Sequence, residues 1–110
     1  MRYTVHEDPD LDLGHGHTLR WTSFTPDRGL NPQYADVPDV EKYGALVGHA
    51  RGDGTRCEGF VTFDSEISRR IAPDRAKWTV ESWEPLTITP SLACHCGDHG
   101  WIRDGRWIPA

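Results

Sequence analysis

The 110-residue sequence has no long apolar run, and this excludes several classes of protein. No stretch approaches the ~18 consecutive apolar residues of a membrane-spanning helix, so we expect no role at a membrane. The first ten residues lack the apolar core of a secretion signal, which predicts that the chain acts in the cytoplasm where it is made. Only 36% of the residues are hydrophobic. We therefore expect a single small domain with a thin core.

Basic residues are also in the minority. The sequence contains 12 Lys and Arg residues and 17 Asp and Glu residues, which gives a net charge of −5. Proteins that bind nucleic acid usually carry a basic surface, so this charge argues against nucleic acid as a partner. We expect the partners to be other proteins or further copies of the chain.

The familiar catalytic motifs are missing as well. The sequence contains no P-loop, no dinucleotide-binding glycine fingerprint, no H-E-x-x-H, no zinc-deaminase pattern and no G-x-S-x-G. These absences favour a role without catalysis, with an enzyme as the alternative.

Short runs of alternating apolar and polar residues predict a mainly β, β-rich α+β fold. The domain is expected to span residues 1–110, with 1–17 as an acidic arm or loop. A short helix is expected over 64–71, capped by Asp64 or Ser65 and stopped by Pro73, and a helical turn near 36–42. The predicted strands cover 2–5, 18–24, 43–49, 57–63, 77–83 and 85–89.

The C-terminal residues give the clearest local prediction. Asp104-Gly105 stands between two alternating runs, and this dipeptide supplies the positive φ angles of a type I′ turn. A two-residue loop would pair Ile102 with Trp107 and Trp101 with Ile108. We therefore predict an antiparallel hairpin at this end of the chain.

The three cysteines point to a metal site rather than to a disulfide framework. Cys57, Cys94 and Cys96 are odd in number, and no export signal accompanies them. Cys96 and His99 have the spacing of a metal knuckle, with glycines that permit a tight turn. Tetrahedral Zn²⁺ takes four ligands of the Cys or His type, so another ligand must come from Cys57.

Two ligand sets remain open for this site. His49 precedes Cys57 by eight residues across a predicted turn, so a hairpin can bring the two together. One set is His49, Cys57, Cys96 and His99. The other replaces His49 by Cys94, which requires a kink because alternate residues of one strand otherwise diverge. One structural Zn²⁺ is expected, because a thin core gains folding free energy from a bound metal.

The last quarter of the chain also carries a resemblance to a known family. The segment 85–108 contains Pro-Leu-Thr-Ile-Thr-Pro-Ser-Leu, the Cys96–His99 knuckle, and Trp-Ile-Arg-Asp-Gly-Arg-Trp. It resembles domain-of-unknown-function family 6527, which is found in actinobacteria, their phages and other bacteria. The resemblance implies a small zinc-binding domain without an assigned activity. Some relatives lie beside genes for ubiquitin-like conjugation.

Together these features predict a small zinc-binding protein of phage or actinobacterial origin with a structural or protein-interaction role. A zinc-dependent hydrolase, or an accessory factor of a ubiquitin-like conjugation pathway, is one alternative. A virion component such as a capsid accessory protein is another.

Overall fold

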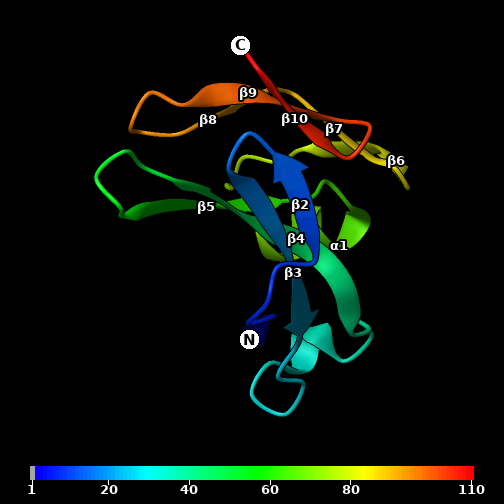
Figure 1. Ribbon diagram of the computed structural model, residues 1–110. Helices are drawn as coiled ribbons and strands as arrows, with labels where there is room; N and C mark the ends of the chain where they lie inside the picture. Colours follow the sequence, from blue (N-terminus) through cyan, green and yellow to red (C-terminus); the bar gives the residue numbers. More distant parts are fainter. Residues whose placement is uncertain (1) are drawn as a thin grey trace.

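The computed structural model describes residues 2–110 and builds them mainly from antiparallel strands (Figure 1). The predicted β-rich fold is confirmed. The strands of the larger sheet are β1 (Arg2–Val5), β2 (Leu11–Gly14), β3 (His17–Thr25), β4 (Val40–Ala50) and β5 (Arg56–Thr62). Their order is β1-β3-β4-β5, and β2 also pairs with β3.

The N-terminal segment differs from the expected acidic arm or loop. β1 and β2 both pair with β3, at Val5↔Thr22 and at Leu11↔Leu19. Leu13 is fully buried in the core while its neighbour Asp12 is exposed. The acidic residues therefore occupy the solvent side of a paired strand, where they do not oppose folding. Met1 lies outside the described residues.

The loop after β3 also differs from the prediction. Its helical turn is the 3₁₀ turn η1 (Pro32–Tyr34), and Val40 within the predicted turn already pairs with Phe24 as part of β4. Pro32 fixes a helical φ angle at the start of the turn, which favours this earlier position.

The predicted short helix is confirmed as α1 (Glu66–Ile71). Ser65 is its N-cap: the Ser65 hydroxyl accepts from the backbone N–H of Ser68, and the Ser68 hydroxyl accepts from that of Ser65. This reciprocal pair satisfies two of the N–H groups that a helix start leaves free.

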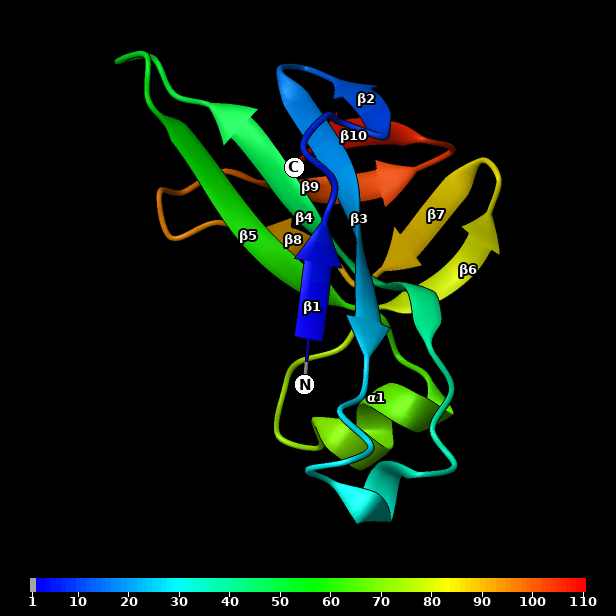
Figure 2. The same cartoon turned by 90° about the horizontal axis from the view of Figure 1, so that it is seen from below.

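A second layer of strands lies across one face of the larger sheet (Figures 1 and 2). It comprises the hairpin β6 (Thr79–Trp83) and β7 (Leu86–Thr89), and a three-stranded sheet of order β10-β9-β8. The strands of that sheet are β8 (Leu92–Ala93), β9 (His99–Arg103) and β10 (Arg106–Pro109).

The C-terminal hairpin forms in the predicted register. Trp107 pairs with Ile102 and Ile108 with Trp101. Asp104 and Gly105 have φ angles of 53° and 74°, as a type I′ turn requires.

The main core lies between the two layers. Side chains of β2 to β5 meet side chains of β7 to β10, and the buried members of this core are each at most 8% exposed. No helix among residues 2–110 has the length and apolar character needed to cross a bilayer. The core side chains include Leu13, Leu19, Val61, Phe63, Leu86, Ile88, Leu92, Ile102 and Trp107.

Candidate functional site

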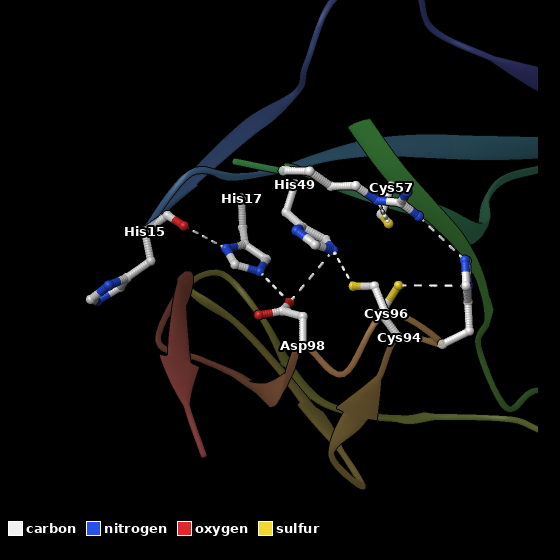
Figure 3. Close-up of polar contacts among 9 residues, drawn as sticks. His15, His17, His49, Cys57, Cys94, Cys96 and Asp98 are labelled. Carbon is white, nitrogen blue, oxygen red and sulfur yellow. Dashed lines mark hydrogen bonds and ion pairs between the residues drawn. The ribbon is translucent and has the colours of Figure 1, made fainter. Parts of the chain in front are cut away.

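Four side chains of the metal-binding type converge at one end of the interface between the layers (Figure 3). They are His49, Cys57, Cys94 and Cys96, and their ligand atoms all lie within 4.8 Å of one another. The Nε2 atom of His49 is 3.5 Å from the Sγ atom of Cys96. These four residues can hold a metal ion.

The β4–β5 hairpin supplies half of this cluster. His49 and Cys57 are directly opposite each other in the strand register, and both are shielded from solvent. Side chains of directly opposed residues lie on the same face of a sheet. Local strand pairing therefore brings the two ligands together, as the sequence predicts.

The turn between β8 and β9 supplies the other half. The backbone N–H of Gly97 donates to the carbonyl of Cys94 at 2.9 Å, and the N–H of Cys94 donates to the carbonyl of Asp98. Gly97 has a φ of 99°, which suits glycine. This turn kinks the backbone enough for Cys94 and Cys96 to face the same side.

The cluster combines the two ligand sets that the sequence left open. His49 and Cys94 are both present, together with Cys57 and Cys96. His99 is not brought to the cluster. Its ring instead lies beside the hydroxyl of Ser91.

Nearby donors favour negative charge on Cys96. The backbone N–H of Asp98 lowers the pKa of Cys96 to about 7, with further help from Cys94, Cys57 and His49. Arg51 donates from Nε to the Sγ atom of Cys57 at 2.7 Å. This hydrogen bond raises the pKa of Arg51, so the guanidinium stays charged beside the thiol.

Cys94 titrates in the opposite direction. The backbone N–H of Cys96 lowers its pKa, but burial and the side chains of Cys96 and Cys57 outweigh that effect and raise it. The neighbouring thiols therefore do not ionise equally without a cation among them.

Asp98 connects the cluster to the first hairpin. Its Oδ2 atom lies 2.6 Å from Nε2 of His17 and 3.8 Å from Nε2 of His49. The other ring nitrogen of His17 is 2.7 Å from the carbonyl oxygen of His15, as Figure 3 shows. His17 is therefore held at both ring nitrogens, beside the four-residue cluster but not part of it.

A second site lies on the opposite side of the β8–β9 sheet. The Oγ atom of Ser91 is 2.9 Å from Nε2 of His99. A serine hydroxyl within hydrogen-bond distance of an imidazole nitrogen is the arrangement that a nucleophile and its general base adopt. The pair is accessible, since Ser91 is half-buried and His99 exposed.

Side chains alternate in direction along β9, and this explains why His99 lies beside Ser91 and not in the metal-ligand cluster. Asp98 is directed inward, to His17, so the next residue along an extended chain is directed outward. His99 pairs with Ala93 in the register, and Ser91 lies two residues before Ala93 on the same side. The spacing of Cys96 and His99 resembles a metal knuckle, yet β9 begins at His99 and turns its side chain away from the cluster.

Ser91 is the residue that sequence reasoning missed. No G-x-S-x-G surrounds it, and its only signal is a position eight residues before His99 across a turn. Trp78 fixes its backbone, because the indole Nε1 donates to the Ser91 carbonyl at 3.2 Å. Trp78 also lines a cavity of about 150 Å³ that extends to Cys57 and Cys94.

Comparison with known proteins identifies the family. Curated proteins and solved structures gave no significant match. A family model described as "Bacterial ubiquitination-like system serine protease (BubE)" matches residues 48–110, more than half of the chain. The assignment to domain-of-unknown-function family 6527 is therefore wrong, because this model covers the segment on which that resemblance rested. The chain belongs to the family of serine proteases of bacterial ubiquitination-like systems, BubE.

Proposed function

We propose that this protein is a serine protease that cleaves proteins joined by a bacterial ubiquitin-like conjugation system, with Ser91 as nucleophile and His99 as general base. The observation that carries the proposal is the 2.9 Å contact between Ser91 Oγ and His99 Nε2. Both residues lie within the stretch that matches the family model. Its partners are accordingly proteins: the modifier and the proteins to which it is joined.

The chemistry follows from that contact. His99 takes the proton as the Ser91 oxygen attacks the carbonyl carbon of the scissile amide. The same imidazole then protonates the leaving amine, and an acyl-enzyme ester on Ser91 remains. Water, deprotonated by His99, hydrolyses this ester and frees the serine.

His99 is held in place by its strand and by an aromatic neighbour. Its carbonyl accepts from the N–H of Ala110, and its ring centroid lies 5.7 Å from that of Trp101. Among residues 2–110, no carboxylate is hydrogen-bonded to the His99 ring. We therefore propose a two-residue catalytic pair whose base is oriented by packing.

We also propose that the cluster of His49, Cys57, Cys94 and Cys96 binds one structural Zn²⁺. Zn–S and Zn–N bonds of ~2.3 and ~2.0 Å in a tetrahedron place ligand atoms about 3.5–3.8 Å apart. The 3.5 Å between His49 and Cys96 fits this spacing. Three thiolates and Zn²⁺ leave one negative charge, which Arg51 balances at Cys57.

This zinc would have a structural purpose. It would join the β4–β5 hairpin to the turn that leads directly into His99. The metal would thus fix one side of the catalytic pair without taking part in the reaction. Four protein ligands leave no open position for a substrate or a water molecule.

The test of the catalytic proposal is covalent labelling of the nucleophile. Purified protein would be treated with a fluorophosphonate probe, digested, and analysed by mass spectrometry. We expect the probe to label Ser91. The label should be absent from Ser91→Ala protein and present in Ser82→Ala protein, the control, in which a serine of β6 is replaced. Cleavage of a linear fusion of the system's ubiquitin-like protein should show the same dependence. Labelling elsewhere, or cleavage by Ser91→Ala equal to wild type, would refute the proposal.

This proposed catalytic function differs from the structural or protein-interaction role that the sequence alone favours. It agrees with the alternative that places the chain in a ubiquitin-like conjugation pathway. The phage origin and the virion role stay untested predictions.

A further inference from the structure

The catalytic pair lies at one end of a continuous outer face of the β8-β9-β10 sheet. Residues of β9 alternate, with Gly100 and Ile102 buried and His99 and Arg103 exposed. Trp101 lies between these two on the same outer side. On β10, Trp107 is buried and Ile108 is exposed.

The register places apolar and basic side chains next to each other on this face. Ile108 is directly opposite Trp101 and is 40% exposed. The guanidinium carbon of Arg103 lies 5.4 Å from the ring centroid of Trp101. We call the surface formed by Trp101, Arg103 and Ile108 the Trp101 face.

The charge of this face is opposite to that of the chain. The protein carries a net charge of −5, yet Arg103 pairs in the register with Arg106. Within residues 2–110, neither arginine forms an ion pair. An arginine that stacks on an aromatic ring while its charge stays unpaired is suited to bind a carboxylate.

We propose that the Trp101 face binds the substrate chain beside Ser91 and selects an extended segment with an acidic side chain. An apolar side chain of the substrate packs on Trp101 and Ile108, and a carboxylate two residues further along meets Arg103. This inference rests on the proposed protease function, because it assigns the substrate class of the same site.

The spacing of the substrate residues follows from strand geometry. An extended chain advances ~3.3 Å per residue, so His99, Trp101 and Arg103 lie at intervals of ~6.6 Å along β9. An extended substrate that runs along this strand has the same repeat. The apolar and acidic residues of the substrate are therefore two positions apart, matching the interval from Trp101 to Arg103.

The experiment measures binding apart from hydrolysis, with Ser91→Ala protein throughout. Four fluorescein-labelled peptides share a Gly-Ser host and carry Leu-x-Asp, Leu-x-Lys, Ala-x-Asp or Ala-x-Lys. Fluorescence anisotropy gives each dissociation constant. We expect Leu-x-Asp to bind about threefold to fivefold more tightly than Leu-x-Lys, as suits one exposed charge pair.

A charge reversal tests the assignment to Arg103. Adding Arg103→Glu should invert the preference between Leu-x-Asp and Leu-x-Lys, and the milder Arg103→Gln should abolish it. Arg2→Glu makes the same charge change on β1 of the larger sheet and should leave the preference intact. Equal binding of all four peptides, no binding, or equal effects of Arg103→Glu and Arg2→Glu would each overturn the inference. Failure of Ser91 to take the fluorophosphonate label would instead refute the catalytic proposal.

Discussion

Trp107 of the last strand stacks on His17 of the first long strand, with ring centroids 4.1 Å apart and planes 9° from parallel. His17 in turn stacks on His49 at 5.1 Å. This stack joins the C-terminal hairpin to β3 and β4, next to the cluster of His49, Cys57, Cys94 and Cys96. The relative position of the two layers therefore depends on a tryptophan that is 3% exposed.

Trp107→Ala should strongly destabilise the fold. Removal of a buried aromatic side chain typically costs ~3–5 kcal/mol of unfolding free energy, through lost contacts and the cavity that remains. Urea denaturation followed by circular dichroism measures the loss. Trp83, which is 48% exposed, supplies the control, and Trp83→Ala should cost much less. Equal losses would contradict the role of the stack.

Substitution of His49 should impair metal binding, whereas substitution of His99 should impair only catalysis. His49→Ala removes a proposed ligand, so purified protein should contain well below one equivalent of zinc by elemental analysis and unfold at lower temperature. His99→Ala should keep the full equivalent of zinc but lose cleavage activity, because its ring faces Ser91. Loss of zinc in His99→Ala would show that this residue is a ligand after all.

Gly100 should tolerate no side chain. A Cβ atom there would lie 2.5 Å from the carbonyl oxygen of Ile108 and 2.7 Å from the ring of Trp107. Such overpacking costs about 1–3 kcal/mol, so Gly100→Ala should lower the urea midpoint clearly. Gly59 on β5 has no neighbour within 4 Å of an added Cβ, and Gly59→Ala is the matched control. A stable Gly100→Ala protein would refute the close approach of the strands.

The ion pair between Arg70 and Asp36 should give a pH-dependent contribution to stability. Two hydrogen bonds of 2.9 Å link the guanidinium to the carboxylate, and they lower the pKa of Asp36. A lowered carboxyl pKa means that the contribution is present above the ordinary value of 3.8 and is lost as the pH falls through the lowered one. The effect is small, because both side chains are exposed.

Arg70→Gln removes that contribution. The difference in urea midpoint between wild type and variant should be present at pH 7 and shrink towards pH 2. An NMR titration of the Asp36 carboxyl should show its pKa rise towards 3.8 in the variant. A difference in stability that grows as the pH falls would contradict the assignment.

Local structure followed directly from the sequence. The C-terminal turn at Asp104-Gly105, the Ser65 cap and the His49–Cys57 pairing each depend on residues within about ten positions of one another. Their geometry depends on turn residues, side-chain caps and strand alternation, and all three can be recognised from residue types in the sequence. The sequence also limited the metal ligands to five candidates.

The tertiary structure alone determined which of those five candidates lie together and which serine lies beside His99. Cys96 and His99 are three residues apart, yet they face opposite sides because β9 begins at His99 and its inner face packs on the larger sheet. That packing directs Asp98 to His17, 81 residues away, and leaves His99 beside Ser91. A sequence pattern shows that neighbours alternate, but only the buried face of the sheet determines which of them is turned inward.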